Sequence, residues 1–336
     1  MRIGSLFGIP LYIDSSWLLI LVLITLINAS DINARGLSGE MPILGWIAGF
    51  ATALSIFASV LLHELGHSLV ARSQGIAVKS ITLFLFGGVA SIERESKTPG
   101  GAFQVAIAGP IVSVALFGLF SLLTQVLGES RLLQFISSDL ARINLAVALF
   151  NLIPGLPLDG GQVLKAIVWK LTGDRLRGME WASASGRLLG GLGMAAGLFL
   201  LLLTGEIGAL WISLISWFVL SNANAYDRVT RLQRTLLELV AADAMTRDFR
   251  IINANLTLRD FADEYILSGM AAPAPYYAVS DGRYRGLVRV SDLNSVERSQ
   301  WEGKTLADIA HPLTEIPSVQ ERTPLVEVIN QLEKMS

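Results

Sequence analysis

Six long apolar stretches in the first two thirds of this chain limit the folds that it can adopt. A helix that crosses a bilayer needs about 20 predominantly apolar residues, at a rise of about 1.5 Å per residue. The shorter stretches are also compatible with a buried helix or a re-entrant segment. The sequence favours an α-helical polytopic membrane protein with about six transmembrane helices, at Ser15–Asn28, Ile43–Ala71, Phe103–Leu127, Leu140–Leu171 (with an interruption), Leu188–Leu203 and Gly208–Asn222.

Charged residues divide the chain into two parts. Residues 1–224 hold 25 of the 54 Asp, Glu, Lys and Arg residues, and residues 225–336 hold the other 29. Since a soluble globular protein has roughly 25% charged residues, we expect a membrane domain at 1–224, a linker at 225–235 and a soluble domain at 236–336. This excludes a wholly soluble enzyme. The net charge of −2 and the absence of cysteine exclude a nucleic-acid binder and a disulfide scaffold.

Basic residues in the short loops predict the orientation of the membrane domain, because Lys and Arg are enriched in cytoplasmic loops. With the N-terminus in the cytoplasm, twelve of them lie inside and only Arg35, Arg131 and Arg142 lie outside. We therefore expect both termini in the cytoplasm, and we recognise no removable signal peptide. The twelve residues are Arg2, Arg72, Lys79, Arg94, Lys97, Lys170, Arg175, Arg177, Arg187, Arg228, Arg231 and Arg234.

The second apolar stretch contains the pentapeptide His63-Glu64-Leu65-Gly66-His67. Residues four apart share a helix face, so both imidazoles can bind one metal ion. Two neutral histidines suit Zn²⁺, which needs a third protein ligand and keeps one position for water. Glu64, one residue further around the helix, is placed to take a proton from that water. The alternative is a polar cluster that packs helices, but an intramembrane carboxylate is costly and by default functional.

The pentapeptide does not by itself fix the third ligand. A histidine six residues after the second one is absent, because Ser73 occupies that position, and the remaining histidine, His311, lies in the soluble part. Glu93 fits by spacing, but charged neighbours such as Glu95 are typical of a solvated turn. Asp159 is the better candidate, because it lies within an otherwise apolar stretch.

The segment that contains Asp159 is not expected to be a regular helix. Between Asn151 and Gly161 it has two prolines and three glycines, which interrupt helical hydrogen bonding. Irregular backbone at membrane depth is tolerated where it is buried in protein or lines a cavity, so Asp159 should face a wet cavity. Asn151 offers an amide for a substrate carbonyl or a developing oxyanion, with helix packing as its alternative role.

Together the two motifs resemble those of the site-2 protease family of intramembrane zinc metalloproteases, over about residues 1–224. The resemblance assigns His63 and His67 as helix ligands of zinc, Glu64 as general base, Asp159 as third ligand and Asn151 as the asparagine of the family. Ala108-Gly109-Pro110 is a further, shorter similarity.

Residues 76–92 (IAVKSITLFLFGGVASI) predict a short β-hairpin, because they are rich in β-branched and aromatic residues and contain Gly87-Gly88. We expect the hairpin to pack against the helices, since backbone at membrane depth must find internal partners; a cytoplasmic loop with two strands is the alternative. Gly87 and Gly88 also resemble a feature of the family. A strand edge beside the site can hold an extended peptide, so both glycines are candidates for substrate binding.

The resemblance implies an endopeptidase that cleaves transmembrane segments of other proteins within the bilayer, commonly after a first cut has removed an ectodomain. The implied substrates are membrane-tethered regulators such as anti-sigma factors, and the implied location is a prokaryotic inner membrane. Two other classes stay open. One is a regulated transporter whose buried His and Asp bind ions, and the other is a catalytically inactive protein that binds transmembrane segments.

The soluble part contains an internal repeat, in which the pattern that begins at Asp243 recurs 65 residues later at Asp308. It resembles a tandem cystathionine β-synthase-type (CBS) repeat, which implies a small α/β regulatory domain with a nucleotide cleft between two halves. The second copy ends at Ser336, before any counterpart of Gly286-Leu287-Val288. The sequence therefore leaves open a nucleotide ligand, a homodimer through this domain and a simple α/β docking role.

Overall fold

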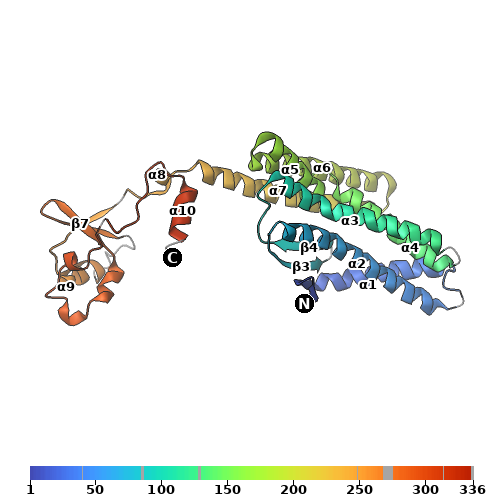
Figure 1. Cartoon of the computed structure of the whole chain (residues 1–336), viewed down its shortest axis with the longest axis horizontal. Coiled ribbons are helices and arrows are strands. Elements are labelled where there is room, and N and C mark those ends of the chain that lie inside the picture. Colours follow the sequence, from blue (N-terminus) through green and yellow to red (C-terminus); the bar gives the residue numbers. More distant parts are fainter. Residues whose placement is uncertain are drawn as a thin grey trace. The chain divides into compact units, whose positions relative to one another are not determined.

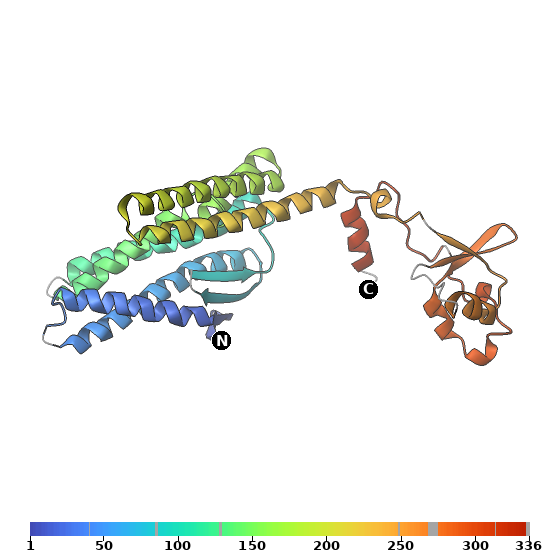
Figure 2. The same cartoon turned by 180° about the vertical axis from the view of Figure 1, so that it is seen from behind.

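The structure, a computed structural model, describes residues 1–39, 41–84, 87–127, 130–247, 249–267, 275–312 and 314–333. It divides into two compact units, Met1–Leu232 and Gln233–Ser336. Figures 1 and 2 show the helices of the first unit and the smaller sheet of the second. We describe each unit by itself.

Five helices of the first unit are long and apolar enough to cross a membrane, and they are α1, α2, α3, α4 and α6. The expected stretch Leu140–Leu171 is divided between α4 and α5, and Gly208–Asn222 falls in α7, which is not among the five. Residues 225–235, expected as a linker, continue α7 as helix. The bounds are α1 (Ser15–Ala34), α2 (Pro42–Ser73), α3 (Pro99–Val126), α4 (Arg131–Asn151), α5 (Asp159–Thr172), α6 (Arg175–Thr204) and α7 (Ala209–Glu238).

Local sequence signals set the ends of these helices. Asp14 and Asp174 precede α1 and α6, and their side chains accept hydrogen bonds from backbone N–H groups of the first turn. Pro42 occupies the first position of α2, where a missing N–H costs nothing. Gly173 and Gly205 end α5 and α6 in the left-handed conformation, each at φ +72°.

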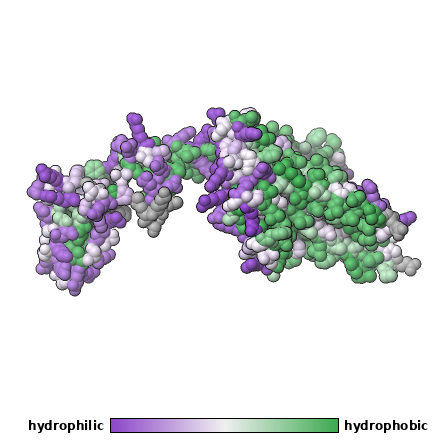
Figure 3. Space-filling view, in the orientation of Figure 1, coloured by the Kyte–Doolittle hydropathy of each residue, from purple (hydrophilic) through white to green (hydrophobic). Residues whose placement is uncertain are grey.

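Small residues bring the membrane helices close together. A Cβ at Gly49 of α2 would lie 2.7 Å from the backbone nitrogen of Ala29 of α1, so this contact requires glycine. Many large apolar side chains instead point outward, Leu19 and Ile47 among them. Figure 3 shows the resulting apolar surface over the helices. Such a surface suits a lipid environment.

A four-stranded sheet packs against α2 in the order β1-β2-β3-β4. Its strands are β1 (Arg2–Leu6), β2 (Ile9–Ile13), β3 (Val78–Phe84) and β4 (Gly87–Ile92). The β2–β3 pair is parallel and the other two pairs are antiparallel. Ile9, Leu11 and Ile81 bury against Leu65 of α2. The predicted hairpin at 76–92 is therefore confirmed, the N-terminal hairpin was not anticipated, and β4 forms one edge of the sheet.

The second unit is a small α/β structure around a three-stranded sheet in the order β5-β6-β7. Asp281 and Gly282, both with positive φ, make the tight turn between β6 and β7. Phe261 and Tyr276 are fully buried in its core. The bounds are α8 (Ala241–Ala244), β5 (Arg250–Asn253), α9 (Leu258–Phe261), a π-helical turn (Ala262–Ile266), β6 (Tyr276–Ser280), β7 (Arg283–Val288), 3₁₀ turns at Val290–Ser295, Arg298–Gln300 and Leu306–Asp308, and α10 (Leu325–Glu333).

Candidate metal centre

Helix α2 presents His63 and His67 side by side, one helical turn apart. Both are buried, at 4% and 8% exposure, although α2 is apolar enough to cross a membrane. Two polar rings in such a place need partners, because an unpaired buried polar group is costly. Their partners come from α3 and α5.

Contacts with α3 orient both rings and fix the proton of His67 on Nδ1. The Nδ1 of His67 lies 2.7 Å from the carbonyl oxygen of Val105, and a carbonyl can only accept, so Nδ1 is the protonated nitrogen. The Nδ1 of His63 lies 2.9 Å from the hydroxyl of Ser113, which offers an equivalent acceptor. In the neutral rings both Nε2 atoms then present lone pairs to the same point, as metal-binding histidines do.

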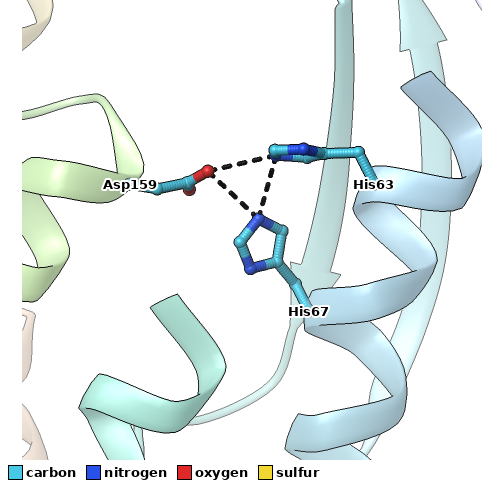
Figure 4. A group of neighbouring side chains, drawn as sticks. All are labelled: His63, His67 and Asp159. Atoms are coloured by element: carbon cyan, nitrogen blue, oxygen red, sulfur yellow. Dashed lines mark hydrogen bonds and ion pairs between the residues drawn. The ribbon is translucent and has the colours of Figure 1, made fainter. Parts of the chain in front are cut away.

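Asp159 lies in the first turn of α5, and its carboxylate points toward the two imidazoles (Figure 4). The irregular segment between α4 and α5 returns the chain beside α2. The next residue must be glycine, because a Cβ at Gly160 would overlap the backbone of Leu152 and Ile153. The Asp-Gly-Gly sequence thus allows the tight packing that brings the carboxylate to the imidazoles.

The three ligand atoms have the spacing of a zinc site. The Oδ2 of Asp159 lies 3.1 Å from the Nε2 of His63 and 3.3 Å from the Nε2 of His67, and the two Nε2 atoms are 3.2 Å apart. Ligand atoms at tetrahedral Zn²⁺, each about 2.0–2.1 Å from the metal, lie about 3.3 Å from one another. Two imidazoles and one carboxylate are also a common ligand set of catalytic zinc. The residues therefore fit zinc.

Gly109 of α3 leaves the space that a metal ion requires. A Cβ at this position would lie 2.6 Å from the Nε2 of His63 and closer still to the Nε2 of His67. The backbone of α3 thus borders the point at which the lone pairs converge. In the sequence this glycine is only part of the shorter similarity Ala108-Gly109-Pro110, which does not indicate that it leaves space for a metal ion.

Glu64 lies beside the three ligands and not among them. It is partly buried, and a Cβ at Gly88 of β4 would lie 2.5 Å from its Cγ. The backbone of β4 therefore packs directly on the Glu64 side chain. This contact requires glycine at position 88.

All seven residues singled out in the sequence line one cavity of about 980 Å³. Within the described residues, the group whose ligand atoms can share a metal is His63, His67 and Asp159. Glu93 lines the cavity outside that group, and His311 lies in the second unit. The other four of the seven residues, which also line the cavity, are Glu64, Gly87, Gly88 and Asn151.

Two features of the site were missed in the sequence. Ser113 is a polar residue in an apolar helix, which is a signal that could have been used. Lys165 lies six residues after Asp159, is 3% exposed and pairs with Glu95 at 2.8 Å. Glu95 lies in an exposed turn, as its charged neighbours indicate, and its carboxylate also pairs with this buried ammonium.

Two histidines and an aspartate that converge in a cavity among membrane-length helices define an integral membrane zinc metallopeptidase. The comparisons agree. The model of peptidase family M50 matches residues 51–142 and 129–189. A Synechocystis protein named "Putative zinc metalloprotease" is 45% identical over 99% of this chain and 88% of its own length. Rip3 of Mycobacterium tuberculosis, named in the same way, is 34% identical over 98% of this chain and 84% of its own.

The chain belongs to peptidase family M50, the site-2 protease family of zinc metalloproteases. A solved structure described as a site-2 protease from Methanocaldococcus jannaschii is 29% identical to it, with a TM-score of 0.45, and covers 68% of this chain and 94% of its own. The family model and the two named relatives confirm the family resemblance, the enzyme class and the zinc cofactor predicted from the sequence.

Proposed function

We propose that this protein is an intramembrane endopeptidase that cleaves transmembrane segments of other membrane proteins. The observation that carries the proposal is the position of the ligand triangle. His63, His67 and Asp159 line a cavity that also contains Glu64 and the edge strand β4. A metal, a base and a peptide-binding edge are the parts that hydrolysis of a peptide bond requires.

Each polar residue of the cavity has a role in this proposal. Zinc, when bound, supplies a Lewis acid that activates water and polarises a carbonyl. Glu64 accepts the proton of the attacking water and passes it to the leaving amine. Asn151, at the C-terminal end of α4, donates its amide to the oxygen on which negative charge develops. Gly88 allows the close contact that orients Glu64.

A substrate helix must unwind before its carbonyls can be attacked, and β4 provides a partner for the extended segment. The strand lies at the edge of its sheet and lines the cavity with Gly87, Gly88 and Val89. Addition of a peptide strand to such an edge supplies backbone hydrogen bonds without a sequence requirement. We assign Gly87 and Gly88 to substrate binding on this basis.

We place both termini in the cytoplasm of a prokaryotic cell, on the inner membrane, from the distribution of Lys and Arg. His67 then lies about 9 Å from the cytoplasmic end of α2 at Ser73, at 1.5 Å per residue. Water reaches the site from that side, and the cytoplasmic product leaves the same way. A membrane-tethered regulator such as an anti-sigma factor is the substrate class that we propose.

For the second unit we propose a CBS-like regulatory role. Asp243 and Asp308, the equivalent positions of the repeat, each accept a hydrogen bond from the backbone N–H three residues earlier. Leu258 and Leu325, which are 67 residues apart, likewise begin helices α9 and α10. A nucleotide ligand and a homodimer through this unit stay predictions of that resemblance.

A single substitution tests the proposed reaction. Glu64→Gln should retain one zinc per chain and lose cleavage of a single-span reporter protein in proteoliposomes, because the amide cannot accept the proton. Glu206→Gln, an exposed change outside the cavity, is the matched control and should cleave normally. Undiminished cleavage by Glu64→Gln would refute the assigned mechanism.

A further inference from the structure

The proposed reaction does not use one buried cation of the cavity, Lys165. It lies on α5, two turns beyond Asp159, is 3% exposed and lines the cavity. Its ammonium lies 2.8 Å from the Oε2 of Glu95 and 3.4 Å from the Oε1 of Gln162. A buried ammonium is costly unless it is paired, so the question is whether these two partners satisfy it.

The pairing of Lys165 is incomplete. An ammonium has three N–H donors, and among the residues that the structure describes only Glu95 and Gln162 accept from it. The same Oε2 of Glu95 also lies 3.3 Å from Arg175. One carboxylate thus serves two cations, the buried Lys165 that lines the cavity and the more exposed Arg175 that does not, so these three side chains together have an excess positive charge.

The other charges of this end of the cavity do not remove that excess. Glu93 and Arg94 line it and cancel each other. At the metal end, Glu64 and Asp159 balance a divalent zinc ion. The group that complements the remaining charge is an anion, and in a protein substrate it is the side chain of Asp or Glu.

The distance along α5 defines where such a side chain lies. Six residues of helix separate Asp159 from Lys165, which is about 9 Å. An extended peptide advances about 3.3 Å per residue, so this distance equals about three residues of substrate. We propose that Lys165 binds an acidic side chain of the substrate about three residues from the scissile bond, with Glu95 as its positioning residue. This rests on the proposed function and adds a specificity subsite to it.

The test uses single-span substrates that carry Asp, Asn or Lys at two to four residues on each side of the mapped cleavage point. The full chain should cleave the best Asp substrate with a kcat/KM at least tenfold above that of its Asn counterpart. Lys165→Met should bring this ratio to about one, with little change for the Asn substrate. Lys170→Met, an exposed change on the same helix, should keep the preference.

A charge exchange gives the sharper result. In Glu95→Lys combined with Lys165→Glu the ion pair is kept, while the cavity gains a carboxylate in place of the ammonium. This variant should prefer Lys over Asp at the same substrate position. Exchange of a buried pair can disturb folding. If the double variant does not fold, the result for Lys165→Met decides on the proposal by itself.

A binding measurement separates this proposal from the proposed function. Zinc-loaded Glu64→Gln protein should bind the Asp peptide at least tenfold more tightly than the Asn peptide, and addition of Lys165→Met should abolish the difference. An Asp preference that survives Lys165→Met, or an equal loss for all substrates, would overturn the subsite. Failure of Glu64 to matter for cleavage would instead overturn the proposed function, and the binding result would still decide on Lys165.

Discussion

Gly109→Ala should remove zinc from the site while the protein stays folded. The new Cβ would lie 2.6 Å from the Nε2 of His63, whereas ordinary contact begins at 3.4 Å. Its relief requires α3 or the imidazoles to move by at least about 0.8 Å, and by more for the closer His67, which exceeds the tolerance of about 0.5 Å for a binding constellation. We expect zinc affinity to fall at least 100-fold, or about 2.7 kcal/mol.

The assay is a zinc titration against a competing chelator on the detergent-solubilised chain. Gly118→Ala is the matched control, because it changes the same helix at a position where a Cβ meets nothing within 4 Å. Alanine is the better helix former by about 1 kcal/mol, so Gly118→Ala should not lower the thermal stability of the zinc-free protein, and a melt of zinc-free Gly109→Ala checks that this variant is folded. Unchanged zinc affinity in Gly109→Ala would refute the assignment of that space to the metal.

Two further predictions concern partners of charged and metal-binding groups. Ser113→Ala should weaken zinc binding about 10- to 100-fold, because the Nδ1 of His63 loses its partner; Ser113→Thr keeps the hydroxyl and should bind nearly as wild type does in the same titration. Asp227→Asn should lower the melting temperature at pH 7. Arg187, 2.5 Å away, holds the pKa of the Asp227 carboxyl below its usual range. This stabilisation exists above the unfolded pKa of about 4 and is lost as the pH falls below it, so the two proteins should converge in thermal melts at acidic pH.

The three residues whose ligand atoms can share a metal ion could be predicted from sequence because their signals are local. His63 and His67 share a helix face by spacing alone, and Asp159 is conspicuous as a carboxylate in an apolar stretch. Capping residues and glycines at the helix ends are equally local signals. The number of membrane helices was harder, since α5 has 14 residues and α7 combines an apolar with a polar half.

Contacts between distant segments could not be predicted in this way. The N-terminal strands pair with a hairpin some 70 residues later, as Leu11 pairs with Ile81. Charged neighbours indicated an exposed turn around Glu95, which the structure has. They did not indicate its partner, Lys165, which lies 70 residues further along the chain and on another element.

By itself the sequence determined the membrane character, the zinc-binding helix, the third ligand as the best candidate and the family. These follow from the apolar length of a helix, from its period of 3.6 residues and from the cost of a charge in lipid. Only the tertiary structure decided which side chains orient the imidazoles and why Gly109 must lack a side chain. It also decided that the ammonium of Lys165 lines the cavity. Those answers depend on packing between helices far apart in sequence, where a difference of less than 1 Å determines whether a metal ion fits.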